Sequence, residues 1–147
     1  MEFQLIVDKN EKETVVATVH QRSELTDRIE KLVMQYTGTD RIPGYTEDDV
    51  KLLTYAEIEC ITVRDGKTYA VDRMGVQYRL RLRLYEVEKM LPSCFVRINK
   101  SSLANENRLE KFTAGFGGAV DAVFRSGYRE YVSRRCFTVI RRRFDVK

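Results

Sequence analysis

The amino-acid sequence predicts a mainly β fold with short helices, an α+β class in which a small ββα unit precedes a larger antiparallel β domain. Apolar and polar residues alternate in short segments separated by turn residues, as in paired β-strands. A few stretches instead show the apolar spacing of an amphipathic helix. We expect two parts: an N-terminal unit with its connector at residues 1–49, and a β domain at residues 50–147.

The N-terminal unit is expected to be a hairpin followed by a helix. Residues 3–7 and 14–19 read as two strands joined by a polar turn. Ser23 can cap the helix, which should end before Gly38. Its apolar face consists of Leu25, Ile29, Leu32, Val33 and Tyr36. Residues 37–49, which contain glycine, proline and an acidic cluster, are expected to be a connector.

The first half of the β domain should hold several strands and a short helix. Segments 50–54, 58–63 and 68–72 read as strands, and Asp-Gly in the turn before residue 68 is a strong hairpin signal. Residues 78–84 alternate arginine with leucine, so a strand would bury the leucines and expose a row of guanidinium groups. Such a row also protects an exposed sheet edge. Residues 84–91 fit a helix that ends near a proline.

The second half should form a meander that ends in a helix. The segment at 95–98 is extended, and those at 109–114 and 119–124 flank a glycine-rich turn. A further strand is expected at 128–132. Ser133 can then cap a helix from residue 134 to about residue 144. Its apolar face consists of Phe137, Ile140 and Phe144, with arginines on another face.

The charge of the chain is distributed unevenly. Residues 1–60 carry 7 Lys/Arg against 13 Asp/Glu, a net charge of −6, whereas residues 61–147 carry 19 against 9, a net charge of +10. This asymmetry is expected when one region meets a polyanion, although an unevenly charged solvated surface is the alternative. No apolar run is long enough to cross a membrane and no signal peptide is present, so we expect a cytoplasmic protein.

The residues that enzymes use for catalysis are poorly represented. His20 is the only histidine and has no partner motif, and none of the common nucleotide-binding, hydrolase or metalloprotease motifs occurs. The three cysteines Cys60, Cys94 and Cys136 are widely spaced and indicate neither a disulfide framework nor a zinc site. We therefore expect no enzyme, no metal and no cofactor.

The start of the last helix favours a bound anion. Arg134 and Arg135 lie in its first turn, where cations oppose the helix dipole. A phosphate held by these arginines and Ser133 would remove the conflict, but ion pairs with acidic residues elsewhere would also do so. The run at 141–143 lies near the helix C-terminus, where cations are favoured without any ligand. Residues 95–105 add a mixture of basic, amide and hydroxyl side chains that can contact a phosphate backbone.

Several segments resemble one known family when they are taken in order. They are Arg97-Ile98-Asn99-Lys100-Ser101 followed by Asn105, then a glycine-rich turn, then Val132-Ser133-Arg134-Arg135, and, upstream, Glu57-Ile58, Asp65-Gly66-Lys67-Thr68 and the helical segment at 84–91. Together they resemble the LytTR DNA-binding domain of bacterial transcription regulators, over about residues 50–147. The resemblance implies an elongated antiparallel β fold whose loops enter successive major grooves.

The resemblance also implies which residues contact DNA. The base-reading positions of the family fall at Lys67 or Thr68, Lys100 and Arg135. Lysine and arginine can donate to guanine, and threonine can contact a base or a thymine methyl group. The expected backbone contacts are Arg64, Arg97, Asn99, Ser101, Ser133 and Arg134. Residues 1–49 are too short for a receiver domain, so the chain is similar to stand-alone LytTR proteins, some of which act with a membrane-protein partner.

These observations lead to one functional hypothesis and two alternatives. The hypothesis is a sequence-specific regulator that binds repeated half-sites in double-stranded DNA as a homodimer, with the ββα unit as the dimerisation or signal-receiving element. One alternative is a single-stranded nucleic-acid or RNA-binding module, because Phe112, Phe116, Tyr128 and Tyr131 are interleaved with basic residues. The other is a protein-interaction module whose basic surface meets an acidic partner.

Overall fold

The fold is built from a seven-stranded sheet and a three-stranded sheet, in which all strand pairs are antiparallel. The structure is a computed structural model that describes residues 1–114 and 119–144. Its helices and strands are α1 (Glu24–Thr37), β1 (Arg41–Tyr45), β2 (Val50–Thr54), β3 (Ile58–Arg64), β4 (Lys67–Asp72), β5 (Gln77–Leu80), α2 (Leu84–Met90), β6 (Phe95–Asn99), β7 (Ser102–Asn105), β8 (Leu109–Ala114), β9 (Val120–Phe124), β10 (Arg129–Val132) and α3 (Arg134–Phe144). The larger sheet has the order β2-β1-β5-β4-β3-β7-β6, and the smaller one the order β10-β9-β8.

Two hydrophobic cores lie on opposite faces of the central strands. Neighbouring residues such as Cys60 and Ile61 in β3 are both fully buried, because each side chain enters a different core. The first core includes Ile61 and Leu84 and is covered by α2. The second includes Cys60, Phe124 and Ile140, and it joins the larger sheet to the smaller sheet and α3. The central strands therefore carry both layers of the domain.

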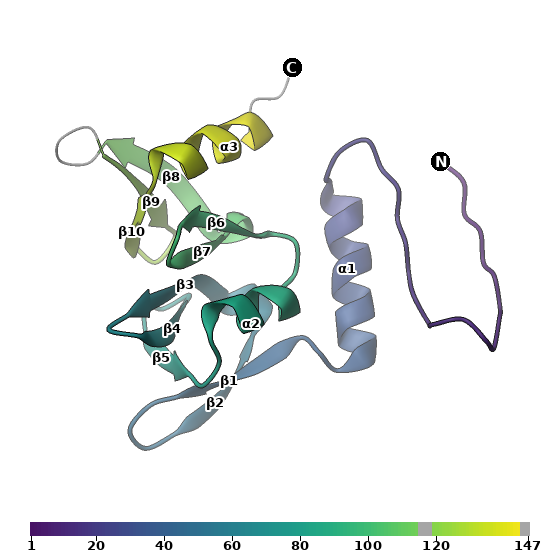
Figure 1. The fold of residues 1–147 in the computed structure, drawn as a ribbon, viewed down its shortest axis with the longest axis horizontal. Helices are drawn as coiled ribbons and strands as arrows, with labels where there is room; N and C mark the ends of the chain where they lie inside the picture. Colours follow the sequence, from purple (N-terminus) through teal and green to yellow (C-terminus); the bar gives the residue numbers. More distant parts are fainter. Residues whose placement is uncertain (115–118, 145–147) are drawn as a thin grey trace.

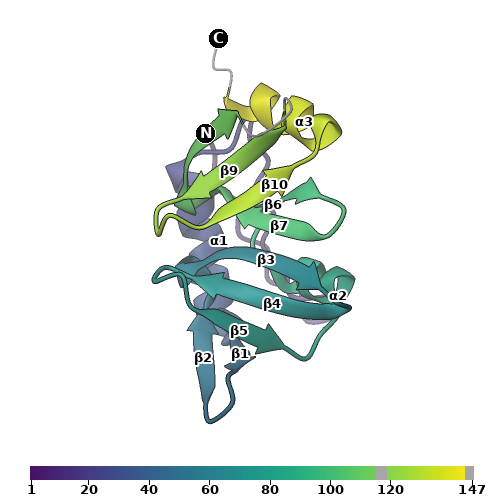
Figure 2. The same ribbon diagram turned by 90° about the vertical axis from the view of Figure 1, so that its left-hand side faces the viewer.

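The layers are stacked along one direction, which gives the elongated antiparallel β domain that the resemblance implied. Figure 2 shows the succession from β9 and β10 through β6, β7, β3 and β4 to β1 and β2. The helices at α1, α2 and α3 agree closely with the predicted ones. No helix in residues 1–114 or 119–144 is long and apolar enough to cross a membrane.

The predicted N-terminal hairpin is wrong. Residues 3–7 and 14–19 form no strands, and only α1 of the expected ββα unit is present. Residues 8–11 do form the turn, in which the Glu11 amide donates to the Asp8 carbonyl over 3.4 Å. An isolated two-stranded hairpin is only marginally stable, and no described strand pairs with residues 3–7 or 14–19. Phe3 is accordingly 89 % exposed.

The segment that we expected to be a connector contains a strand. β1 pairs with β2 along its whole length and with β5 at Tyr45, so the larger sheet begins at residue 41. The predicted division at residue 49 falls between these two paired strands. Proline and glycine in this segment suggested a loop, but Pro43 and Gly44 are both accommodated in β1.

We predict that Gly44→Ala destabilises the fold. A Cβ atom at this position would lie 2.7 Å from the Cδ1 atom of Leu53 and 2.7 Å from the Cβ atom of Tyr78. Because the Cβ atom of Tyr78 cannot move without its backbone, the free energy of unfolding should fall by about 1–3 kcal/mol. Urea denaturation measures this change, and Val50→Ala at an exposed position of β2 is the control. Equal stability of the two variants would contradict the close approach.

The strand that carries the alternating arginines after residue 78 is shorter than predicted, and it does not lie at the edge of the sheet. β5 ends at Leu80 and lies between β4 and β1, so it is an interior strand. Arg79 lies in β5, Arg83 caps α2, and the guanidinium carbon of Arg81 lies 4.0 Å from the ring centroid of Tyr45. Because β5 is an interior strand, protection of a sheet edge does not explain these arginines. The row is also interrupted, because the chain turns into α2 after β5.

Candidate nucleic-acid interface

The turn between β3 and β4 exposes the first predicted contact residue. Asp65 and Gly66 adopt positive φ angles of 51° and 73°, and Arg64 pairs with Lys67, as in the two-residue hairpin that Asp-Gly predicts. Lys67 is exposed at the start of β4, whereas Thr68 is only 5 % exposed. The guanidinium group of Arg64 donates to the Gln77 side chain and lies over the Tyr69 ring. Of the alternatives Lys67 and Thr68, only Lys67 is displayed to solvent.

The turn between β6 and β7 is held by side-chain hydrogen bonds. An irregularity in pairing between Arg97 and Asn99 precedes it and redirects the chain into the exposed Lys100. Asn99 is 8 % exposed; its Oδ1 atom accepts from the Ser101 amide at 2.7 Å, and its Nδ2 atom donates to the Tyr131 carbonyl at 2.7 Å. Asn99 is therefore engaged within the fold.

Arg97 is also engaged within the fold. Its Nε and Nη2 atoms each lie 3.0 Å from a carboxylate oxygen of Glu88, and its Nη1 atom donates to the Lys100 carbonyl at 2.7 Å. The hydrogen bond from Arg97 lowers the pKa of Glu88, so the carboxylate stays ionised at neutral pH. The sequence predicted a phosphate contact for Arg97, but this guanidinium fixes the turn that presents Lys100.

The start of α3 presents two arginines. Ser133 caps the helix as predicted, because its Oγ atom accepts from the Cys136 amide at 3.2 Å. Arg134 and Arg135 are exposed, and neither forms an ion pair within residues 1–114 and 119–144. The first turn of α3 also contains no acidic residue. The conflict between these cations and the helix dipole is thus not relieved by the described part of the chain.

Backbone and side-chain hydrogen bonds join these three elements into one edge. The Val63 amide donates to the Ser101 carbonyl at 2.9 Å, which ties the end of β3 to the β6–β7 turn. The Ser133 amide donates to the Ile98 carbonyl at 2.8 Å, which ties the start of α3 to β6. Figure 1 shows both turns and the start of α3 on one side of the molecule, with α1 on the opposite side. We call this side the loop edge: the β3–β4 turn, the β6–β7 turn and the first turn of α3.

The loop edge carries four cations that are available to a ligand. Lys67, Lys100, Arg134 and Arg135 are exposed and form no ion pair with a described residue. Elsewhere, several arginines neutralise acidic groups: Arg22, Arg97, Arg108, Arg129 and Arg143. The loop edge therefore presents positive charge that is not neutralised by an ion pair with a described residue, and this charge can attract a polyanion.

The aromatic residues form no stacking platform in the described part of the chain. Phe112 packs edge-on against Phe137, with ring centroids 5.4 Å apart, and Tyr128 donates to Glu130 at 2.8 Å while packing against the second core. Burial raises the pKa of Tyr128. Tyr131 is 49 % exposed, and Phe116 lies outside the described residues. The single-strand alternative relied on these rings being displayed together.

The family model of the LytTr DNA-binding domain matches residues 48–145. This chain belongs to that family. DNA is therefore the ligand of the LytTr domain, and membership in a family of DNA-binding domains confirms the prediction that the chain is not an enzyme. The loop edge lies within the matched residues and carries four exposed cations without an ion pair to a described residue.

Similar proteins agree with this assignment. The chain is 26 % identical to an HTH-type transcriptional regulator of Staphylococcus aureus strain bovine RF122 / ET3-1 and 25 % identical to one of strain NCTC 8325 / PS 47, each over 99 % of both chains. A solved LytTr DNA-binding domain of a Bacillus cereus methyl-accepting/DNA response regulator has a TM-score of 0.64 at 19 % identity, covering 73 % of this chain and 98 % of that one. The three helices of our chain are separated by strands, so its described residues contain no helix-turn-helix pair.

Variants of Arg97 test whether this residue positions the Lys100 turn or contacts DNA directly. We predict that Arg97→Lys weakens DNA binding nearly as much as Arg97→Ala, by about 1 kcal/mol or roughly fivefold, because one ammonium group cannot bond both Glu88 and the Lys100 carbonyl. Mobility shifts on one duplex would compare the two variants. Wild-type affinity of Arg97→Lys would mean that charge alone matters and that Arg97 contacts phosphate.

Sequence reasoning missed Glu88 as part of the site. It lies on the exposed side of α2, nine positions from its partner, so no local spacing signals the pair. The sequence also did not reveal that the Tyr131 carbonyl accepts a hydrogen bond from Asn99, because any residue type can supply a backbone acceptor. A shift of one residue in the pairing of β6 with β7 is also a property of the folded sheet. These groups act by fixing the Lys100 turn.

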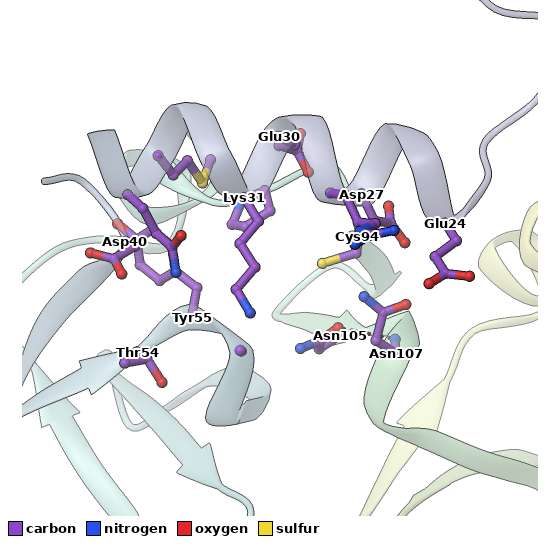
Figure 3. Close-up of a pocket in the computed structure, with 15 residues that line it drawn as sticks. Glu24, Asp27, Glu30, Lys31, Asp40, Thr54, Tyr55, Cys94, Asn105 and Asn107 are labelled. Carbon is purple, nitrogen blue, oxygen red and sulfur yellow. Dashed lines mark hydrogen bonds between the residues drawn. The ribbon is translucent and has the colours of Figure 1, made fainter. Parts of the chain in front are cut away.

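A hollow lies away from the loop edge, between α1 and the LytTr domain. Its volume is about 420 Å³, and Figure 3 shows Lys31 and Glu24 extending from α1 toward the domain. Cys94 lines it, and burial raises the pKa of this thiol to about 11, so the sulfur stays protonated at neutral pH. The hollow shows where α1 meets the domain.

Proposed function

We propose that this protein is a transcription regulator that reads specific sequences in double-stranded DNA through the loop edge. The observation that carries the proposal is the cluster of exposed cations without ion pairs on three elements that hydrogen bonds tie together. Duplex DNA presents successive phosphates and major-groove base edges along one side, which suits a row of loops. The relatives described as transcriptional regulators match the chain from end to end. We also propose a cytoplasmic location, because the protein would have to reach the chromosome.

The proposed contacts divide into two kinds. Lys67, Lys100 and Arg135 donate to base edges, since each is exposed at the tip of its element. Arg134 contacts phosphate, with support from Arg64 and from the hydroxyl groups of Ser101 and Ser133. Thr68 supports the first turn from a buried position. Arg97 and Asn99 hold the second turn in place.

Repeated half-sites and a homodimer complete the proposal. One loop edge offers few base-reading side chains, so a second copy on a neighbouring half-site would raise both affinity and specificity. A membrane-protein partner, as in some stand-alone LytTR proteins, would act through the part of the chain outside the matched domain. The exposed N-terminal residues are available for either association.

Mobility shifts on the DNA upstream of the protein's own gene test the proposal. We expect a specific complex whose affinity falls steeply with salt, because binding releases counterions from the phosphates. Footprinting on genomic DNA would then locate the half-sites. Absent or salt-insensitive binding would refute the proposal, and binding to single strands with no affinity for the duplex would favour the alternative.

A further inference from the structure

Helix α1 turns its apolar side away from the domain on which it lies. Leu25, Leu32 and Tyr36, spaced seven and four residues apart, share one side of the helix and are 45 %, 68 % and 86 % exposed. A surface helix of a single domain normally buries such a stripe. In α1 this stripe stays exposed, and the neighbouring Ile29 and Val33 are only half-buried.

The opposite side of α1 attaches the helix to the LytTr domain. Glu30 accepts from the amide and the hydroxyl group of Ser93 at 3.1 Å and 3.2 Å. Asp27 pairs at 2.8 Å with Arg22, which pairs in turn with Glu106 at 3.1 Å. Met34 packs against the first core. These contacts, made on the side of the helix seen facing the domain in Figure 3, hold the apolar stripe outward.

The residues before α1 add more exposed apolar surface. Residues 1–7 and 12–20 form no backbone hydrogen bond with a described residue, and Figure 1 shows this segment on the side of α1 that faces away from the domain. Its two arms, residues 3–7 and 14–19, keep the composition of strands. Its large apolar side chains are at least 39 % exposed: Phe3, Leu5, Ile6, Val7, Val15, Val16 and Val19.

The combined surface is large enough for a stable dimer. Together the stripe of α1 and the two arms present on the order of 1,000 Å² of apolar side-chain surface, at about 100 Å² for each large side chain. The largest apolar patch of a typical monomer is about 300–600 Å², whereas a standard interface buries about 800 Å² on each partner. The exposed surface therefore fits an interface and exceeds that of an ordinary free monomer.

We propose that a second copy of this chain covers this surface, with the arms of the two copies pairing into one sheet that packs on both α1 stripes. This deepens the homodimer of the proposed function and rests on it. Charge supports self-association, because residues 1–22 carry four acidic and three basic residues and so repel a copy of themselves little. The relatives match this region as well as the domain. The arms of a second copy would also supply the additional strands that an isolated hairpin needs for stability.

The oligomeric state of the full chain tests the proposal. Sedimentation should give the wild type twice the mass of the 17.2 kDa chain, and Leu32→Lys and Val16→Lys should each give the single mass. Lysine has a helix propensity close to that of leucine at position 32 of α1, and both sites are exposed, so the variants should fold normally by circular dichroism. Leu52→Lys, at a leucine of β2 that is 58 % exposed, is the matched control and should stay dimeric.

DNA binding separates failure of this interface from failure of the proposed function. The folded Leu32→Lys monomer should still bind a single half-site duplex within about twofold of wild type, but lose the tighter binding to the repeated site. A monomeric wild type, or a dimer that survives Leu32→Lys and Val16→Lys, would overturn the interface. So would stripe-dependent binding of a monomeric wild type to phosphatidylethanolamine–phosphatidylglycerol vesicles, which would assign the surface to a membrane. Loss of DNA binding by every form would instead refute the proposed function.

Discussion

Replacing Glu59 by alanine should lower the free energy of unfolding by about 3 kcal/mol or more, because it breaks a buried ionic cluster. The carboxylate is fully buried in β3. One oxygen accepts from Arg108 at 3.1 Å and from the Ser126 amide at 3.2 Å, and the other accepts from the Ser126 hydroxyl group at 2.5 Å. Arg108 and Ser126 flank strands of the smaller sheet, so Glu59 joins the two sheets.

Urea denaturation of Glu59→Ala and of a control would measure this effect. Glu110→Ala, at an exposed position of β8, should change the stability by no more than about 0.5 kcal/mol. The smaller sheet also carries β10 and α3, so DNA binding by Glu59→Ala should weaken in parallel. A loss of stability below about 1 kcal/mol would show that the cluster does not hold the sheets together.

Arg135→Ala should weaken binding to the cognate site by about 1–3 kcal/mol and relax its specificity, because it removes a proposed base contact. Arg134→Ala should weaken binding to all duplexes similarly and reduce the salt dependence, because it removes a phosphate contact. The two arginines are matched neighbours, both exposed and both without an ion pair to a described residue. They therefore control for each other.

Mobility shifts on cognate and random duplexes at two salt concentrations would separate these roles. We expect the ratio of cognate to random affinity to fall for Arg135→Ala and to be unchanged for Arg134→Ala. Equal losses on both duplexes for both variants would mean that Arg135 contacts only the backbone. A larger loss of specificity for Arg134→Ala would reverse the two assignments.

Local sequence patterns predicted most of the β domain, because turn residues, helix caps and apolar alternation mark its elements within short segments. Asp65-Gly66 predicted the β3–β4 turn, and Ser133 predicted the start of α3. The same patterns failed at residues 3–7 and 14–19, which pair with no strand in the described part of the chain. Strand propensity depends on what the side chains pack against, and a single sequence does not supply that partner.

The candidate site shows the same limit. Exposed cations at Lys67, Lys100 and Arg135 could be chosen from turns and a resemblance. What the sequence did not reveal was which polar side chains are already used within the fold, as Arg97 and Asn99 are. The sequence also suggested hydroxyl groups within residues 95–105 as phosphate contacts, although Ser102 is buried and hydrogen-bonded to Thr62. Long-range pairs of this kind are fixed only by the tertiary structure.

Selection of binding sites from a random duplex library tests the central claim most directly. The library would be presented to the wild type and to Lys67→Ala, Lys100→Ala and Arg135→Ala. If the loop edge reads DNA along one side, each variant should lose its base preference at a different position, with Lys100 between the other two. Uniform loss of affinity with unchanged preferences in all three variants would contradict the account, because the three side chains would then act on phosphates alone.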